Sequence, residues 1–391
     1  MNVRRRLSVL LLSMAAASFF SAPLWALLPA YVESALRAPT TITGLLRAVS
    51  MATAGVVFAV GGAVADGLGS RRAYLIGLAA LGSSGFVYLA AGLPLLLGLS
   101  ILIGVGNAFL TTGGQSYLMR TAPDARIGTG ASLYFISMIL GQAAGSAVFG
   151  FVADHGGYRL MGWILVGGMA ATILGAAMLL TDAERTERPG QGASSILAGY
   201  GDLLGRREIR WLLAVRFLPT CMWGASWVAI PYLMFVATGS NQTAGYYTMS
   251  TLLVAAAVQY PVGRWCDRVG PRRCVIFAAS AIPVTSLVAA LFVGSTTGLW
   301  LCGIAYTSAA WSLSTMMPPL MNTISTGEER GRIVGIAHVA WALGMGVGMY
   351  GAGWLLTFSA AAPFYVGTAF CLATVYCAWR VTRRGPVHVP S

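Results

Sequence analysis

The sequence predicts an all-α membrane protein of twelve transmembrane helices, arranged as two pseudo-symmetric six-helix bundles with both termini in the cytoplasm. Three observations lead to this prediction. Apolar residues make up 57% of the 391 residues and charged residues 9%. The mean hydropathy of +0.73 leaves too few polar side chains to cover a soluble globule of this length. Apolar segments of spanning length recur along the chain, and a short charged motif occurs twice at a fixed offset.

Each predicted span is a continuous apolar segment bounded by charges, proline or glycine. A bilayer core about 30 Å thick needs roughly 20 apolar residues in a helix, whereas the strands of a barrel are shorter and alternate in polarity. The segments are continuous, so we expect helices. The twelve expected spans are residues 7–30, 44–65, 72–92, 95–118, 129–152, 159–181, 209–236, 244–265, 273–293, 297–321, 333–356 and 361–380.

The arginines are distributed unequally between the two predicted sides of the membrane. A net charge of +13 in a soluble protein would suggest a nucleic-acid partner, which we do not expect here. Counted from a cytoplasmic N-terminus, nearly all loop arginines fall inside, and the outside loops hold only Arg37, Arg47 and Arg159. This is the positive-inside pattern of a chain with an even number of spans.

The sequence indicates neither a secretory signal nor a metal or disulfide framework. Residues 1–26 resemble a secretory signal, but the apolar run continues to Ala30 and has a partner in the second half. The cysteines show no CxxC or metal-like spacing, so we expect small buried hydrophobes and neither a metal site nor a cofactor. They are Cys221, Cys266, Cys274, Cys302, Cys371 and Cys377.

The chain contains an internal repeat. Gly62, Asp66, Gly69, Arg71 and Arg72 match Gly263, Asp267, Gly270, Arg272 and Arg273 at a constant offset of 201. Trp25 and Pro29 match Trp227 and Pro231, and Gly141 and Gly145 match Gly344 and Gly348, at offsets of 202 and 203. An ordered series of matches indicates two related halves.

With this repeat, the sequence resembles the major facilitator superfamily of secondary transporters over its whole length. The motif G-x-x-x-D-R-x-G-x-R-R between spans two and three, repeated between spans eight and nine, carries the resemblance. The second copy, which includes Arg268, is nearly complete. The first copy departs from the family pattern at Gly67 and Ser70, where basic residues are usual. The loop PDARIGTG (123–130) and the turn DHGGYR (154–159) also fit the family.

The resemblance implies a gate at the cytoplasmic face. Asp66 and Asp267 would each face the positive N-terminus of a helix in the opposite half, and Arg72 and Arg273 would pair across the same seam. Such contacts form only when the halves close on the inside. The alternative is that these arginines only set the topology.

The resemblance and the charge pattern together give three domains. Residues 1–181 form the first six-helix bundle, 182–208 a cytoplasmic linker, and 209–391 the second bundle with its tail. Within the linker, apolar residues in the segment 195–204 recur at helical spacing, which predicts a short interfacial helix.

Few ionisable residues fall inside the spans, and each is a functional candidate because a charge in a membrane is costly. Arg216 in span seven either binds an anionic substrate group or snorkels to the interface. His338 in span eleven is a packing residue or a proton-coupling group. Arg47 is expected to snorkel or to pair with Glu33 rather than to touch substrate.

Neutral polar and aromatic side chains supply the remaining candidates for a substrate cavity. Tryptophan also anchors helices at membrane interfaces, so only part of this set is expected to face a cavity. The glycines at Gly141, Gly145, Gly344 and Gly348 are expected to permit close helix packing. The polar and aromatic candidates are Asn107, Gln115, Gln142, Gln259, Trp25, Trp223, Trp227, Trp311 and Trp341.

The predicted function is secondary active transport of a small organic solute by alternating access across the bacterial inner membrane, by a monomer coupled to a proton or a counter-transported ion. Export of an amphipathic or aromatic compound is the first expectation. One alternative is an organic-anion transporter or exchanger that uses Arg216. Ser100 and the missing G-P pair in span five argue against the best-known drug antiporters. A non-transporting receptor or assembly factor is the other alternative, and no catalytic constellation indicates an enzyme.

Overall fold

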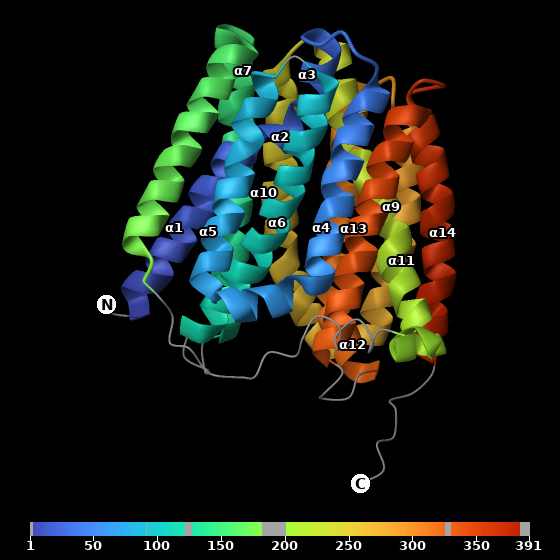
Figure 1. Cartoon of the computed structure of the whole chain (residues 1–391). Helices are drawn as coiled ribbons and strands as arrows, with labels where there is room; N and C mark the ends of the chain where they lie inside the picture. The colour runs from blue at the N-terminus through green and yellow to red at the C-terminus, as the bar shows by residue number, and fades with distance from the viewer. Residues whose placement is uncertain (1–2, 91, 122–126, 182–200, 325–329, 384–391) are drawn as a thin grey trace.

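The computed structural model describes residues 3–90, 92–121, 127–181, 201–324 and 330–383, and these form a bundle of long helices (Figure 1). The first half contains α1 (Val3–Ser21), α2 (Pro23–Ala26), α3 (Leu28–Ser34), α4 (Thr40–Leu68), α5 (Ser70–Leu81), η1 (Gly82–Tyr88), α6 (Leu93–Thr121) and α7 (Ile127–Leu179). The second half contains α9 (Arg207–Thr238), α10 (Asn241–Val269), α11 (Pro271–Leu291), α12 (Thr296–Ile324), α13 (Arg330–Leu355) and α14 (Ala362–Arg383). Each of the twelve predicted spans overlaps one or more of these helices.

The prediction of one continuous first helix is wrong in detail. Residues 7–30 are divided among α1, α2 and α3, with breaks at Ala22 and Leu27. Pro23 and Pro29 explain this division, because proline has no N–H to donate to the preceding turn. The break leaves backbone carbonyls of α2 without helical partners.

The third, fifth and sixth spans also differ from the single continuous helices expected. The third predicted span contains most of α5 and the 3₁₀ helix η1, where Gly85 lies too close to Val166 of α7 for a side chain. The fifth and sixth spans are merged in α7 and separated only at Gly157, which has a φ of 77°. Glycine adopts this left-handed conformation without strain, so the chain reverses there.

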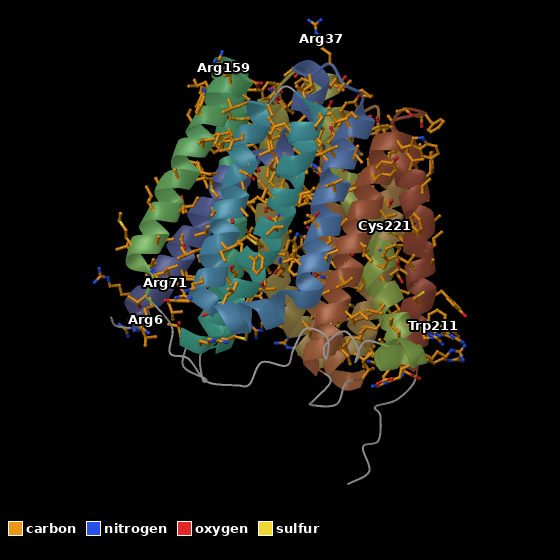
Figure 2. The ribbon with its side chains drawn as sticks, viewed as in Figure 1. Arg6, Arg37, Arg71, Arg159, Trp211 and Cys221 are labelled. Carbon is orange, nitrogen blue, oxygen red and sulfur yellow. The ribbon has the colours of Figure 1, made fainter. Side chains whose placement is uncertain are left out.

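Eight helical segments of the described chain are long and apolar enough to cross a membrane, and Leu133–Leu179 contains two predicted spans. Figure 2 shows Arg37 and Arg159 at one end of the bundle, and Arg6, Arg71 and Trp211 at the other. We call the first end outside and the second inside, following the arginine distribution. The helix α1 begins and α14 ends at the inside end (Figure 1).

The two halves repeat each other in backbone conformation. Gly69, between α4 and α5, has φ 88° and ψ 139°, and Gly270, between α10 and α11, has φ 90° and ψ 149°. The matched motif copies therefore form the same left-handed turn, which other residues adopt only with strain. All six cysteines are free thiols, and five are buried.

The matched glycines pack equivalent helices together. In the first half α7 lies against α1, where a Cβ at Gly141 or Gly145 would collide with the carbonyl oxygens of Ala15 or Phe19. In the second half α13 lies against α9, where a Cβ at Gly348 would collide with the Cys221 carbonyl oxygen. The packing role predicted for these glycines is confirmed.

Of the predicted linker, residues 182–200 lie outside the described part of the chain. Residues 201–205 are helical, which agrees with the C-terminal end of the expected interfacial helix. The domain boundaries stay a prediction, with α9 beginning at Arg207.

We expect Gly348→Ala to destabilise the protein, because a methyl group has no space against the Cys221 backbone. Overpacking of this kind costs about 1–3 kcal/mol, and the thermal unfolding midpoint in detergent should fall. Gly351→Ala is the matched control, because Gly351 lies three residues further along α13 with open space around its Cα. Equal unfolding midpoints for the two variants would contradict close packing at Gly348.

Candidate functional site

The two halves are held together toward the outside end by two helix pairs. In the first pair, Thr40 at the start of α4 donates from Oγ1 to the carbonyl of Gly353 near the end of α13, at 3.0 Å. In the second pair, Gly150 and Ser146 of α7 lie against the backbone of the first turns of α10. These contacts close the outside end, and we call them, with those of Asp154, Tyr158 and Arg47 described below, the outside seal. The contact of α4 with α13 continues toward the inside as far as Phe58 and His338.

A carboxylate of the first half caps a helix of the second half at the outside end. Asp154 accepts hydrogen bonds from the backbone N–H groups of Asn241 and Gln242, both at 2.9 Å. It also accepts from Ser240 Oγ at 2.7 Å and Asn241 Nδ2 at 2.9 Å. The N-terminus of α10 carries a partial positive charge, which a carboxylate stabilises. Asp154 is therefore a charged contact between the halves at the edge of the outside seal.

Tyr158 extends this seal on the same side. Its hydroxyl donates to Asn241 Oδ1 at 2.8 Å, and Ser34 Oγ donates to the Tyr158 hydroxyl at 3.3 Å. The Tyr158 ring packs on those of Tyr31 and Tyr88. The turn 154–159 thus connects α3, α7 and α10. The internal repeat gives no sign of this role.

Arg47 joins the halves in the centre of the seal. Its Nη2 donates to the carbonyls of Leu24 and Trp25, at 2.7 and 2.8 Å, and its Nη1 donates to the carbonyl of Trp227 in the other half. The expectation of snorkelling or pairing with Glu33 is wrong, because Arg47 is only 4% exposed and its guanidinium donates to three backbone carbonyl oxygens.

Proline explains why these carbonyls are available. The helical donor for the Trp25 carbonyl would be residue 29 and that for the Trp227 carbonyl residue 231, and both residues are prolines without an N–H. The repeated Trp-x-x-x-Pro pattern therefore creates one free acceptor in each half. The pattern is visible in the sequence, but that Arg47 would bind both acceptors could not be predicted.

The structure places Trp25 and Trp227 in the seal. Their rings contact edge to face at 5.4 Å between centroids, and the Arg47 guanidinium lies 5.9 Å from the Trp25 ring centroid. In this state these two predicted cavity residues contact each other across the seam.

A second cluster lies in the second half and contains the remaining candidate tryptophans. Arg216 of α9 donates from Nη1 to Ser314 Oγ of α12 at 2.9 Å, and its guanidinium lies 6.0 Å from the Trp341 ring centroid of α13. The Trp223 ring is 5.1 Å from that of Trp311 and 6.4 Å from that of Trp341. We call these five residues the Arg216 cluster.

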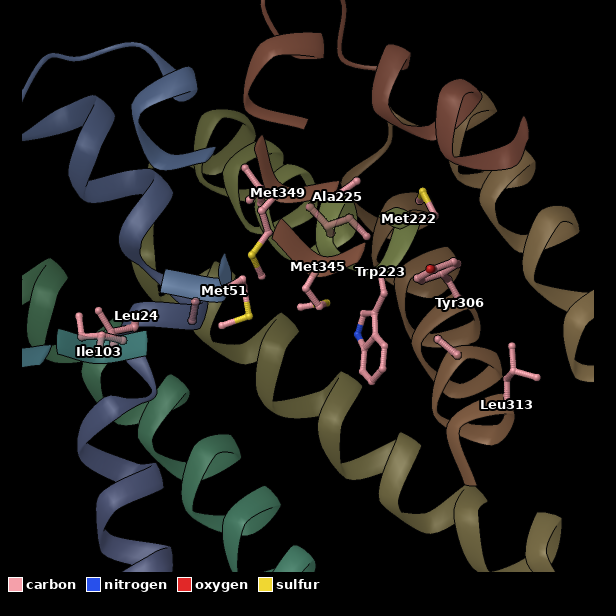
Figure 3. Packing of buried hydrophobic residues seen from close by; sticks show 14 of the residues in the cluster. Leu24, Met51, Ile103, Met222, Trp223, Ala225, Tyr306, Leu313, Met345 and Met349 are labelled. Carbon is pink, nitrogen blue, oxygen red and sulfur yellow. The ribbon is translucent and has the colours of Figure 1, made fainter. Parts of the chain in front are cut away.

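The Arg216 cluster has unused hydrogen-bonding capacity. Arg216 is partly exposed, and it has no carboxylate partner among the residues that the structure describes. The indole N–H groups of Trp223 and Trp311 are buried without an acceptor. In Figure 3 the Trp223 indole points downward in the view, away from Met222. The cluster can thus offer a cation, aromatic faces and N–H donors to a bound molecule.

The position of Arg216 along α9 places the cluster between the inside end and the middle of the bundle. Figure 2 shows Trp211 at the inside end and Cys221 nearer mid-height, and Arg216 lies between them in sequence. The Trp227 carbonyl at the seal is eleven residues further along, about 16 Å at the rise of an α-helix. Arg216 therefore lies between the seal and the inside end of the bundle.

His338 lies at the seam between the halves. Its ring packs 5.7 Å from that of Phe58 in α4, and its Nδ1 lies 2.9 Å from the Val334 carbonyl of its own helix. These contacts favour the packing interpretation. A proton-coupling role stays a prediction.

The neutral polar candidates are distributed over three other helices. Asn107 and Gln115 lie on α6, Gln142 on α7 and Gln259 on α10, and all four are partly buried. The amide nitrogens of Asn107 and Gln259 are buried without an acceptor. In the described part of the chain, no hydrogen bond or ring contact joins these four residues to the Arg216 cluster.

The predicted inside gate is described only in part. The side chains of Asp66 and Asp267 lie outside the described residues, as does the Cα environment of Gly62. Arg71 donates from Nη2 to the carbonyl of Ala177 in α7 at 2.8 Å, a contact within the first half. The other motif arginines, Arg72, Arg268, Arg272 and Arg273, are exposed, and their gating role stays a prediction, as does that of Gly263.

Comparison with known proteins agrees with this architecture. The model of the Major Facilitator Superfamily matches residues 10–236 and 212–391, so the chain belongs to this family. It is 25% identical to the uncharacterised MFS-type transporter YhhS of Escherichia coli (strain K12), over 99% of this chain and 95% of that protein. The YhhS protein of Shigella flexneri is also 25% identical over the same shares.

Solved structures share the fold at low sequence identity. A mutant of the nucleoside transporter NupG superposes with a TM-score of 0.79 at 14% identity, covering 97% of this chain and 100% of that one. A bacterial homologue of the human lysosomal transporter Spinster, inward-facing and unoccupied, gives 0.78 at 14% identity and 98% of both chains. A D-xylose–proton symporter gives 0.76 at 15% identity, with 96% and 98% covered. The two-bundle fold of transporters is thus confirmed.

We expect Asp154→Asn to weaken the outside seal, because the neutral amide loses the charge–dipole attraction and part of the cap. The loss of a helix cap costs about 1 kcal/mol, enough to shift the balance between states about fivefold. Spin labels at Arg159→Cys and Thr357→Cys, in a background with the native cysteines replaced, would report the distance between the halves at the outside end.

The distance distribution should gain a longer component in Asp154→Asn. Asp202→Asn serves as the control, because Asp202 is an exposed carboxylate in the inside helical turn 201–205. A distribution that is the same in all three proteins would show that Asp154 does not hold the seal.

Proposed function

We propose that this protein is a secondary active transporter of the bacterial inner membrane that moves an aromatic or amphipathic organic anion, with the anionic group bound at Arg216. The observation that carries the proposal is the setting of this arginine. It lies inside the bundle with one neutral hydrogen-bond partner, Ser314, and one aromatic face, Trp341. A guanidinium retained inside a membrane without a carboxylate partner among the described residues is a binding group by default.

The surrounding side chains select the rest of the ligand. Three indoles from three helices form the wall next to the cation, and aromatic walls bind flat apolar groups through contact area and edge-to-face packing. The free N–H groups of Trp223 and Trp311 can donate to further acceptors on the ligand. An aromatic carboxylate combines the two features, an anion for Arg216 and a ring for the indoles.

The proposal joins the two transport hypotheses drawn from the sequence. The aromatic character comes from the first and the anion from the alternative that uses Arg216. The solved structures of this fold include a nucleoside transporter, a D-xylose–proton symporter, an organic anion transporter and a transporter in complex with a conjugated peptide, so the fold does not select a substrate. Export is the direction we expect, with a proton or counter-ion as the coupling partner and a monomer as the working unit.

We expect benzoate to raise the thermal unfolding midpoint of the purified protein, and Arg216→Gln to remove this effect. A charge-assisted hydrogen bond contributes about 1.5–3 kcal/mol, which corresponds to a loss of at least tenfold in affinity. Benzamide, which is uncharged and of similar shape, should stabilise the protein far less. The control is Arg210→Gln, because Arg210 lies on the same helix and is exposed.

The alternatives predict other results. Equal stabilisation by benzoate and benzamide, unchanged in Arg216→Gln, would indicate an exporter of uncharged or cationic aromatics and would make Arg216 a topological residue. Benzoate binding without flux into proteoliposomes under a proton gradient would indicate a receptor. Sided flux in oriented vesicles would establish the direction of transport.

A further inference from the structure

A pocket of about 360 Å³ opens at the inside end of the second half, remote from the seal. It lies between the first turns of α9 and the last turns of α14, and its lining side chains are mostly charged. They are Arg207, Glu208, Trp211, Arg380, Val381 and Arg383.

The pocket concentrates positive charge. Three guanidinium groups and one carboxylate line it, which leaves an excess of positive charge among the described residues. The N-terminus of α9 adds its partial positive charge, and its N-cap residue makes no capping hydrogen bond through its side chain. Like charges brought together in this way are costly unless an anion joins them.

Aromatic rings hold the arginines in place. Arg380 lies 5.5 Å from the Trp211 ring centroid and 5.7 Å from that of Tyr376, and Arg383 lies 4.2 Å from that of Trp379. These contacts orient the guanidinium groups without neutralising them, because an aromatic ring carries no net charge. Their N–H groups remain available to an anion with several oxygen atoms.

The pocket faces the lipid rather than the transport path. Tyr376 is 51% exposed and Trp379 39% exposed on the outer surface of α14, and the inside end of the bundle carries the topological arginines. Tyrosine and tryptophan gather at the level of the lipid headgroups. An anion with several oxygen atoms that is always present at this level is the phosphodiester of a phospholipid headgroup, and in an acidic phospholipid no headgroup cation balances its charge.

We propose that this pocket binds the headgroup phosphate of an anionic phospholipid of the cytoplasmic leaflet. The phosphate lies between Arg207, Arg380 and Arg383, and Trp211 forms the apolar floor. Basic pockets between transmembrane helices on the cytoplasmic side bind acidic headgroups through such charge pairing. Because the lipid bridges the first helix and the last helix of the second half, it stabilises their packing independently of the transported substrate.

Native mass spectrometry of the full-length protein, titrated with dioleoylphosphatidylglycerol, tests the site. We expect the first lipid to bind to the wild type at least tenfold more tightly than to Arg380→Gln/Arg383→Gln, since each basic residue at the membrane surface contributes about fivefold. Arg264→Gln/Arg268→Gln is the matched control, because these exposed arginines lie at the inside end of α10 outside the pocket, and its affinity should change less than twofold.

Two further ligands distinguish the source of the phosphate. Dioleoylphosphatidylcholine should bind more weakly than phosphatidylglycerol and should not respond to the double variant. Inorganic phosphate that competes equally well at equal concentration would make this a free-anion site and would overturn the lipid assignment. Equal loss in the pocket and control variants would show only a general effect of net charge. Arg207→Gln provides an independent variant on the other helix.

Discussion

The bonding of Arg47 to backbone carbonyls of both halves is the interaction on which the closed outside end depends. One guanidinium satisfies the oxygens that Pro29 and Pro231 leave without helical donors, and it satisfies them in both halves at once. A neutral side chain at this position would leave three polar atoms unpaired in a buried place, which is costly. The Arg47 guanidinium thus supplies the two hydrogen-bond donors that the backbone lacks at Pro29 and Pro231.

The same electrostatic principle operates at the edge of the seal. Asp154 places a negative charge at the positive end of α10, as the family motif is expected to do with Asp66 and Asp267 at the inside. A transporter closes its two ends in turn, so the contacts at each end must hold the closed state and still break when the halves move a short distance apart. A carboxylate at a helix terminus meets both requirements, since the attraction falls off within one turn.

Much of the architecture could be predicted because it depends on local composition. Each span is visible as an apolar segment, and the turns at Gly69 and Gly270 repeat because the motif repeats. The breaks in the first span follow from Pro23 and Pro29, but the apolar continuity of the segment by itself favours a single helix.

The candidate site could be predicted only as a set of residue types. Arg216 and the tryptophans stand out in the sequence because a charge is rare, and an indole large, in an apolar helix. Their division into two groups, with Trp25 and Trp227 in the seal and Trp223, Trp311 and Trp341 around Arg216, depends on helix rotation. The role of Asp154 cannot be predicted from the sequence, because a carboxylate in a turn has no distinguishing pattern and its partner is a helix of the other half.

The two edges of the seal differ in chemistry, and this difference has a mechanical consequence. The edge between α7 and α10 is held by a charge, whereas the edge between α4 and α13 is held by the neutral bond from Thr40 to the Gly353 carbonyl and by continuous apolar contact. Opening of the outside end therefore requires a charged contact to break between α7 and α10 and neutral contacts to break between α4 and α13.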